Sequence, residues 1–318
     1  MKILITGAAG FVGKHLIEYL KNNGENDISV IALYQEEADS LKRYGVNINI
    51  ADILSADSLK NIICDTEPDH IYHLAAQSSV ELSWRNPALT ADINIKGTIN
   101  LLEILLSESI HARVLLVGSG DEYGNAYINN MPLAENTKLA PTNIYAITKV
   151  CQNMLGSVYV SAYNMDIVMT RAFNHIGPGQ SPKFVVSDFC KQAVEIKNGK
   201  IEPILKVGNT GNKRDFTDVR DVVRAYALLM QNGMSGETYN ISSGKSVSIQ
   251  NIINIIKTQL NINMSIEVDK KRFRPTDNAV IEADSSKLRQ LTGWRNMISL
   301  EQSIMDTIRY WEEVLNEK

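Results

Sequence analysis

The sequence predicts an α/β fold with a doubly wound parallel sheet and a smaller α/β C-terminal domain. Two observations predict it. Short apolar runs alternate with segments of helical spacing through the first half of the 318-residue chain, and a glycine-rich turn follows the first run directly. Strands buried on both faces read as continuous apolar runs, and strands alternating with helices form right-handed βαβ units. The first half is therefore expected to build the sheet.

Each apolar run is expected to form one strand of this sheet. The runs cover residues 2–6, 29–33, 46–50, 70–75, 113–119 and 166–173. Leucine and isoleucine at helical spacing predict one long helix over 96–107 and a second over about 143–164. These two helices are expected to lie on one face of the sheet.

A Gly/Pro-rich connection follows Phe173 and interrupts the alternation. We place the boundary between the two domains there, at 1–173 and 174–318, and expect the chain to return to the first domain at about 207–243. Trp294 and Trp311 are expected to pack the C-terminal domain. Further elements are expected over 184–198, 219–232, 248–260 and 300–316 as helices, and over 237–242 and 265–268 as strands.

Composition and charge exclude several classes of function. The 32 basic and 36 acidic side chains leave a net charge of -4, which lacks the basic field expected of a nucleic-acid binder. Three cysteines without CxxC spacing predict neither a disulfide framework nor a zinc site, and indicate the reducing cytoplasm. No apolar run approaches a membrane-spanning length, and the five histidines lack metal-ligand spacing. No nucleic-acid, membrane or metal partner is expected.

Three glycines follow the first strand in the spacing GxxGxxG, at Gly7, Gly10 and Gly13, and open a helical segment. Such a turn lets the backbone approach a pyrophosphate and aims a helix N-terminus at the phosphates, as in the Rossmann fold. It therefore predicts dinucleotide binding. Asp52 is placed to meet the adenine, although an aspartate that caps the next helix is an alternative.

The residues after the second strand leave NAD and NADP both open. An acidic residue there usually reads the ribose 2'-hydroxyl, and an arginine neighbourhood accommodates a 2'-phosphate. Here the strand ends in the Leu-Tyr-Gln of 33–35. The missing acid and Lys14 favour NADPH, while Glu36 and Glu37 favour NADH.

Tyr145 and Lys149 are four residues apart in a helical segment, so both lie on one face of the helix. A nearby cation favours the phenolate of a tyrosine whose ordinary pKa is about 10. The pair therefore makes a usable acid and base. Ser119 ends the fifth strand and is expected at the carboxyl edge of the sheet, where ligands bind.

Together these motifs resemble the extended short-chain dehydrogenases/reductases that act on nucleotide sugars. The matching segments are TGAAGFVG, LAA at 74–76, Ser119 before DEYG, YAITK and RDFTDVRD. The resemblance implies a catalytic triad of Ser119, Tyr145 and Lys149, a first domain that binds NAD(P) and a second that binds the nucleotide sugar. It implies a cofactor site of Gly7, Gly10, Phe11, Val12, Gly13, Asp52, Ile53, Leu74, Ala75, Ala76, Tyr145 and Lys149.

The residues after Ser119 bear on the reaction. In the similar 4,6-dehydratases an acid or a small polar residue and then a glutamate follow, and these remove water across C5 and C6 of the sugar. This chain has Gly120 and Asp121 instead. The chain is therefore poorly equipped for elimination, whereas a 4-ketoreductase needs only the triad. Asp121 and Glu122 are equally well explained as turn residues.

The segment RAFNHIGPGQSPKFVVSDF and the later RDF and RFRP resemble the reductases that convert GDP-4-keto-6-deoxymannose to GDP-rhamnose. The resemblance implies that Asn174 contacts the sugar diphosphate and that the helix containing Val185 frames the nucleotide. It also implies that Arg214 and Arg274 clamp the diphosphate, which suits the planar fork of arginine. His175 is expected to be structural.

The sequence therefore predicts a cytoplasmic reductase that uses NADPH or NADH on a GDP-linked 4-keto-6-deoxy sugar, either a hexose or a heptose. A GDP-mannose-type 4,6-dehydratase or a 4-epimerase with tightly bound NAD is the alternative, and a redox-sensing binding protein is a further one. By resemblance we expect a homodimer through the helices near 94–109 and 143–164, whose apolar content is compatible with a four-helix interface.

Overall fold

A seven-stranded parallel sheet forms the larger part of the protein in a computed structural model that describes residues 1–128, 131–269 and 280–316. The strand order is β10-β6-β5-β4-β1-β2-β3, and every neighbouring pair is parallel. The strands are β1 (Ile3–Thr6), β2 (Ile28–Ala32), β3 (Asn47–Ile50), β4 (His70–His73), β5 (Arg113–Ser119), β6 (Ile167–Ala172) and β10 (Thr238–Ile241). The predicted doubly wound sheet is confirmed.

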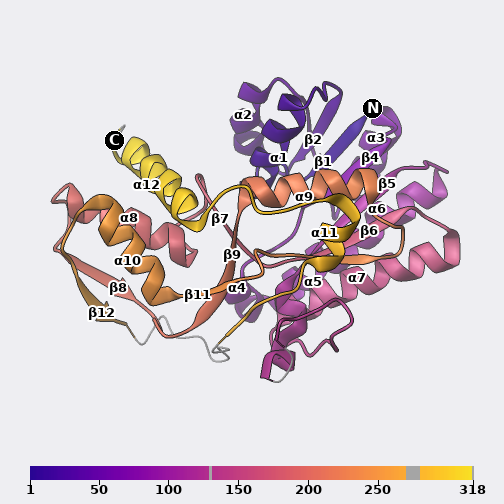
Figure 1. The fold of residues 1–318 in the computed structure, drawn as a ribbon. Helices are drawn as coiled ribbons and strands as arrows, with labels where there is room; N and C mark the ends of the chain where they lie inside the picture. The colour runs from indigo at the N-terminus through magenta and orange to yellow at the C-terminus, as the bar shows by residue number, and fades with distance from the viewer. Residues whose placement is uncertain (129–130, 270–279, 317–318) are drawn as a thin grey trace.

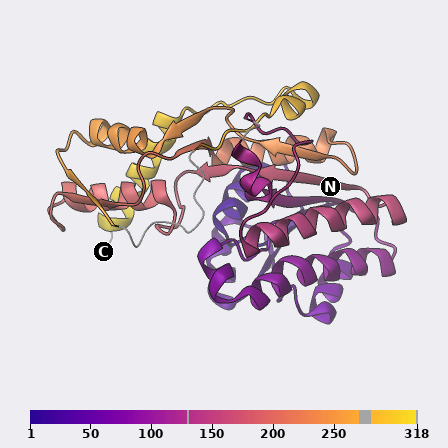
Figure 2. The same ribbon diagram turned by 90° about the horizontal axis from the view of Figure 1, so that it is seen from below.

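Helices cover both faces of this sheet. On one face lie α1 (Phe11–Asn22) and α9 (Val219–Asn232), with a shared core that includes Leu16, Tyr72 and Tyr226. On the other lie α3 (Ala56–Thr66), α6 (Gly97–Ser107) and α7 (Ile144–Tyr163). Figure 2 shows α6 and α7, in purple and magenta, running side by side. The two long helices expected on one face are therefore found there.

Shorter elements connect the strands and helices of this part. They are α2 (Gln35–Leu41), η1 (Lys42–Tyr44), α4 (Val80–Arg85), α5 (Pro87–Ala91), η2 (Asp92–Lys96), η3 (Gly120–Ile128) and α11 (Ser286–Thr292). The π-helical η2 leads directly into α6, and the 3-10 segment η3 directly follows the carboxyl end of β5.

A smaller part of the protein has its own core (Figure 1). It contains α8 (Val185–Lys197), α10 (Ile249–Leu260) and α12 (Leu300–Asn316). The strands β8 (Ile204–Val207) and β12 (Ser265–Val268) pair in parallel, and β11 (Ser246–Ser248), β9 (Lys213–Asp218) and β7 (Asn174–Ile176) form a three-stranded sheet. Isoleucines recur at helical spacing in α10 and place Ile252, Ile253 and Ile256 in this core.

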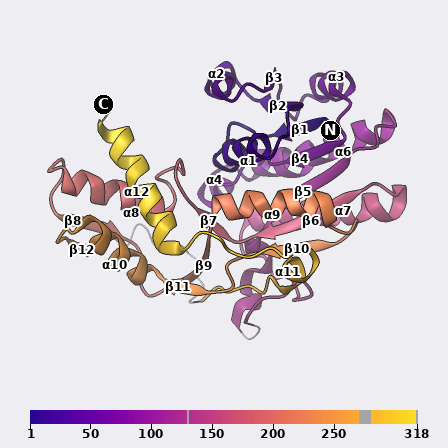
Figure 3. The ribbon, with the colours of Figure 1, turned by 45° about the horizontal axis from the view of Figure 1, so that its top comes forward.

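The chain crosses between the two parts more than once. After the small sheet it returns to the large one, where β10 pairs with β6, and α11 then packs against α9 and β10 (Figure 3). Trp311 packs in the core of the smaller part, as expected. The expectation for Trp294 was wrong: it packs in the core of the large sheet, and its indole N–H donates to the Asp221 carbonyl oxygen at 2.9 Å. It lies there because it directly follows α11.

Among the described residues, no helix is both long and apolar enough to span a membrane. Within 1–128, 131–269 and 280–316 there is also no cluster of side chains suited to a metal ion.

Candidate active site

The three predicted triad residues meet at the carboxyl edge of the large sheet. Ser119 is the last residue of β5, and Tyr145 and Lys149 lie in the first two turns of α7. The helix begins there because the Asn143 side chain caps it, accepting a hydrogen bond from the Ala146 N–H at 2.8 Å. The start of α7 thus faces the end of β5.

Tyr145 is held in its protonated form by its surroundings. Burial raises the pKa of its phenol, the nearby Asp121 carboxylate adds to the rise, and a hydrogen bond with Ser119 opposes it. The Ser119 hydroxyl also accepts a hydrogen bond from the Asp121 N–H at 3.2 Å. A neutral phenol beside a serine hydroxyl can donate a proton to an oxygen bound between them.

Lys149 is buried, at 4% exposed. Its ammonium donates to the Val117 carbonyl oxygen at 2.8 Å and to Gln152 Oε1 at 2.9 Å. Burial lowers the pKa of Lys149 to about 8, while the negative charge of Glu122 opposes the fall. The cation is therefore fixed between β5 and α7 and can favour the phenolate of Tyr145 electrostatically once a proton has left.

The glycine turn lies at the point where the strand order reverses, between β1 and β4, which is the usual ligand crevice of such sheets. Gly7 has φ of 67°, and a Cβ there would lie 2.6 Å from the Ala75 nitrogen. The backbone after β4 therefore closes against the turn, and the predicted cofactor segment 74–76 lies beside it. Gly10, Phe11, Val12 and Gly13 form the start of α1.

The start of α1 suits an anion such as a pyrophosphate. Gly10 occupies the N-cap position without any side-chain cap, and the first turn contains no acidic residue. The leading N–H groups of the helix are thus left to a ligand. The glycine cradle and this helix end fit a dinucleotide.

Asp52 lies at the turn between β3 and α3. Its carboxylate accepts a hydrogen bond from the Leu54 N–H at 2.9 Å, and Ser55 occupies the N-cap position of α3. Ile53 is buried and faces Gly97 at the start of α6. Asp52 is therefore a turn residue next to the cap, and it remains exposed at the same edge of the sheet as the glycine turn.

The predicted substrate residues come from the smaller part of the protein. Asn174 is exposed and begins β7, two residues after Ala172, which is the register partner of Ser119. Arg214 lies on β9, which pairs with β7, and its guanidinium donates to the Lys213 carbonyl oxygen at 2.8 Å. Val185 begins α8 and is 37% exposed. Arg274 lies outside the described residues.

His175 in β7 contacts the start of α1. Its ring stacks on Phe11 with centroids 6.0 Å apart, and its Nδ1 lies 3.1 Å from the Phe173 carbonyl oxygen. Burial lowers the pKa of this imidazole. These contacts are those of a neutral, packed side chain, which fits the expected structural role.

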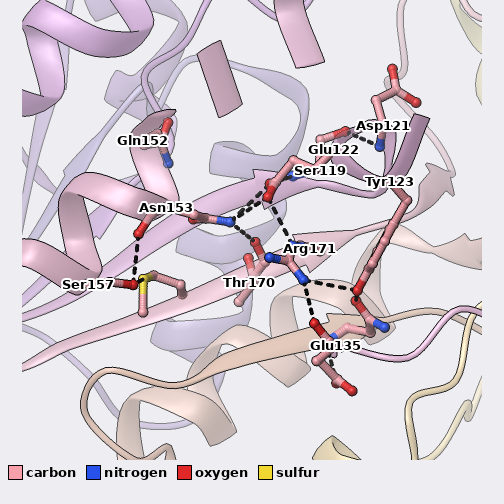
Figure 4. A network of polar contacts seen from close by, with 12 residues as sticks. Ser119, Asp121, Glu122, Tyr123, Glu135, Gln152, Asn153, Ser157, Thr170 and Arg171 are labelled. Carbon is pink, nitrogen blue, oxygen red and sulfur yellow. Dashed lines mark hydrogen bonds and ion pairs between the residues drawn. The ribbon is translucent and has the colours of Figure 1, made fainter. Parts of the chain in front are cut away.

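Sequence reasoning missed a buried polar network directly beneath Ser119 (Figure 4). The Glu122 carboxylate is fully buried and forms an ion pair of 2.9 Å with Arg171. Asn153 Nδ2 donates to both of its oxygens at 3.0 Å. Glu122 is therefore more than the turn residue that the sequence allowed. One sequence offers no signal for it, because Glu122 and Arg171 are 49 positions apart.

A second missed network joins the ends of β1 and β4 to α6. His73 ends β4 and is 1% exposed; its Nδ1 lies 2.9 Å from Thr6 Oγ1 and its Nε2 lies 3.1 Å from Thr98 Oγ1. Thr6 Oγ1 also accepts from the Ala75 N–H at 3.1 Å. Burial lowers the pKa of His73 to about 3. Neutral His73 thus anchors the segment that closes over Gly7.

The chain is similar to known proteins over almost its whole length. The family described as GDP-mannose 4,6 dehydratase matches residues 4–307. GDP-6-deoxy-D-mannose reductase of Pseudomonas aeruginosa is 32% identical over 317 residues, covering 100% of this chain and 99% of that protein.

Two solved structures share the whole fold. RMD from Pseudomonas aeruginosa complexed with NADPH has a TM-score of 0.87 at 30% identity, covering 99% of this chain and 100% of that one. UDP-glucuronic acid 4-epimerase from Bacillus cereus, in complex with UDP-glucuronic acid and NAD, has a TM-score of 0.88 at 26% identity and the same coverage. Similar proteins thus include a reductase and an epimerase, with NADPH or NAD bound.

Proposed function

Because the chain belongs to the GDP-mannose 4,6-dehydratase family of NAD(P)-dependent extended short-chain dehydrogenases/reductases, we propose that it reduces the C4 ketone of a GDP-linked 4-keto-6-deoxy sugar. The product is the 4-hydroxy sugar. The full-length similarity to a GDP-6-deoxy-D-mannose reductase supports both the reaction and the guanine nucleotide.

One observation carries the proposal for reduction rather than elimination. Glu122 is 0% exposed and faces Arg171 and Asn153, so its carboxylate points into the protein and away from any bound sugar. Gly120 offers no acid at all. Asp121 takes the place of the dehydratase glutamate next to Tyr145, but its side chain is one methylene shorter. Ser119, Tyr145 and Lys149 suffice for a ketoreductase, so the site is better equipped for reduction than for elimination.

The proposed roles follow from the geometry of these three residues. The reduced nicotinamide, when bound, supplies a hydride to C4. The Ser119 hydroxyl donates a hydrogen bond that orients the ketone oxygen, and the Tyr145 phenol gives that oxygen its proton. The buried Lys149 ammonium then favours the tyrosinate until solvent returns the proton. Asn174, Val185, Arg214 and Arg274 are proposed to hold the GDP moiety.

The decisive experiment incubates the purified protein with GDP-4-keto-6-deoxymannose and NADPH or NADH and follows consumption of the reduced nicotinamide. We expect stoichiometric consumption and a 4-hydroxy product by NMR. GDP-mannose without reductant tests the dehydratase alternative, and UDP-glucuronic acid tests the epimerase alternative. A keto sugar from GDP-mannose, or a C4 epimer from UDP-glucuronic acid, would refute the reductase proposal.

We further propose a homodimer that forms through α6 and α7. Three apolar side chains along one side of α7 are exposed: Ile147 at 46%, Met154 at 63% and Val158 at 54%. Their spacing of seven and four residues forms a stripe suited to helix packing. Light scattering should give a dimeric mass that Met154→Glu converts to a monomeric one, and a monomeric wild type would contradict the proposal.

We also propose that the protein works in the cytoplasm. Cys64, Cys151 and Cys190 are all free thiols, which fits a reducing compartment.

A further inference from the structure

The Glu122 carboxylate beside Ser119 accepts four hydrogen bonds. Its Oε1 accepts hydrogen bonds from the Ser119 N–H at 2.9 Å and from Asn153 Nδ2 at 3.0 Å. Its Oε2 accepts from Arg171 Nε at 2.9 Å and from Asn153 Nδ2 at 3.0 Å. Each oxygen thus has two donors, and the side chain is 0% exposed. Figure 4 shows these donors converging on it from three elements.

These bonds join the two elements that carry the triad. Ser119 is the end of β5, whereas Asn153 lies on α7, one turn beyond Lys149 and two turns beyond Tyr145. Residues four apart on a helix share a face, so Tyr145, Lys149 and Asn153 all point towards β5. The Glu122 carboxylate therefore fixes the serine backbone relative to the helix that bears the tyrosine and the lysine.

The neighbouring strand is built to admit this carboxylate. A Cβ at Gly118 would lie 2.3 Å from Glu122 Oε1 and 2.5 Å from Asn153 Nδ2. Gly118 is also the register partner of Arg171 on β6, which brings the guanidinium alongside. The Glu122 carboxylate occupies the space that a side chain at position 118 would take, so the arrangement depends on Gly118.

The charge of Glu122 acts on the triad as well. Among the described residues it interacts electrostatically with Arg171 on β6 and with Lys149 and Tyr145 on α7, and Asp121 in η3 acts on Tyr145 as well. Burial raises the pKa of Glu122 to about 7, and the Arg171 guanidinium opposes the rise. The Glu122 anion in turn raises the pKa of both Lys149 and Tyr145.

We propose that Glu122 is a positioning residue for the ketone reduction, which locks Ser119 against α7 and supplies the buried anion opposite the Lys149 ammonium. This inference rests on the proposed reductase function. Glu122 acts through its neighbours, because its enclosed carboxylate has no path to the substrate.

The test compares Glu122→Gln with Glu135→Gln. Glu135 belongs to the same polar region, where its carboxylate accepts from the Asn240 N–H at 2.8 Å, but it bonds neither Ser119 nor α7. We expect Glu122→Gln to lower kcat by about tenfold to a hundredfold through misplacement of Ser119, with both KM values within about twofold. Glu135→Gln should leave kcat unchanged.

The pH profile separates positioning from a merely structural role. Reduction needs the protonated phenol, so kcat falls as Tyr145 ionises at high pH. Without the anion the pKa of Tyr145 is lower, and the alkaline limb of kcat should move to lower pH. Asn153→Ala removes the tie to α7 but keeps the charge, so it should lower kcat without moving the limb.

Glu122→Gln leaves Arg171 buried without its partner and can fail to fold. The double variant Glu122→Gln/Arg171→Gln removes that cation and should show the same shift of the limb. A limb that stays in place in the folded Glu122 variant, or an equal shift in Glu135→Gln, overturns the proposal.

A readout without substrate distinguishes failure of this inference from failure of the proposed function. The Cε resonance of Lys149, assigned with Lys149→Arg in protein labelled with ¹³C-lysine, reports its titration. We expect its pKa to fall in both Glu122 variants and to stay in Glu135→Gln. A wild type that does not reduce the sugar refutes the reductase function, whereas an unchanged Lys149 titration refutes the role of Glu122.

Discussion

Lys149 Nζ lies 2.8 Å from the carbonyl oxygen of Val117, so the ammonium of α7 is bonded to the strand that ends in Ser119. Lys149 lies one turn after Tyr145 on α7, so the buried cation and the phenol share one face of that helix. A tyrosine in such a setting alternates between a proton donor and a stabilised phenolate.

Replacement of either Tyr145 or Lys149 should abolish most of the turnover. We expect Tyr145→Phe to lower kcat by about a hundredfold to ten-thousandfold, the usual contribution of a positioned proton donor. Because phenylalanine keeps the aromatic ring, cofactor binding, followed by fluorescence titration, should change much less than kcat. Tyr163→Phe, on the exposed end of the same helix, is the matched control. Full activity of Tyr145→Phe would exclude the mechanism.

Lys149→Met should lower kcat and also weaken cofactor binding. The variant removes the cation that favours the phenolate. The family resemblance also implies that Lys149 contacts the nicotinamide ribose of the cofactor. We expect kcat to fall by about a hundredfold or more, and the dissociation constant of NADPH to rise. If only kcat changes, the contact with the ribose is wrong.

Preference for NADPH should depend on Lys14 and Arg43. Lys14 lies at the start of α1, where burial lowers its pKa, the Arg43 charge adds to the fall and Glu37 opposes it. Two cations so close to the end of β2 suit a ribose 2'-phosphate. We expect Lys14→Ala to raise the KM of NADPH by about tenfold and to leave that of NADH nearly unchanged.

The control for this prediction is Lys21→Ala, at the opposite end of α1, where the ammonium donates to the Gly45 carbonyl oxygen. It should leave both KM values unchanged. An equal rise for NADPH and NADH in Lys14→Ala would show that Lys14 does not read the 2'-phosphate.

Gly7→Ala should lower the free energy of unfolding far more than Gly24→Ala does, although both glycines have a positive φ. Gly7 and Gly24 both have positive φ, at 67° and 89°. A Cβ at Gly24 meets nothing within 4 Å, whereas one at Gly7 lies 2.6 Å from the Ala75 nitrogen. Urea unfolding should show a loss of about 1 kcal/mol for Gly24→Ala and about 3 kcal/mol or more for Gly7→Ala. Similar losses in both would mean that the turn opens freely.

The fold was predictable because most strands of the large sheet are buried and contain a continuous apolar stretch, such as 114–117 in β5 and 167–169 in β6. The placement of Tyr145 and Lys149 on one helix was predictable because they are four residues apart in a segment of helical spacing. The Glu122–Arg171 pair was not, because only the register of β5 with β6 brings the two residues together. Trp294 was misplaced for a similar reason: the return of the chain to the large sheet decides which core it enters.

His73 should make the protein sensitive to acid. Its folded pKa is lowered from 6.5 to about 3 by burial. The Thr98 hydroxyl donates its proton to the Asn94 carbonyl oxygen, so His73 Nε2–H must donate to the Thr98 oxygen. His73 Nδ1 then accepts from the Thr6 hydroxyl. This bonding pattern suits the neutral ring. A depressed folded pKa adds stability that is complete above pH 6.5 and is lost as the pH falls towards 3.

The measurement is the free energy of unfolding in urea at pH 7 and at about pH 5. Each pH unit below 6.5 costs about 1.4 kcal/mol, so wild type should lose about 2 kcal/mol more than His73→Gln over this range. His70 and His175, whose pKa values are also lowered by burial, contribute equally to both proteins and cancel. His111→Gln, at an exposed position, should keep the wild-type dependence. A parallel pH dependence in wild type and His73→Gln would show that His73 is free to take up a proton in the folded protein.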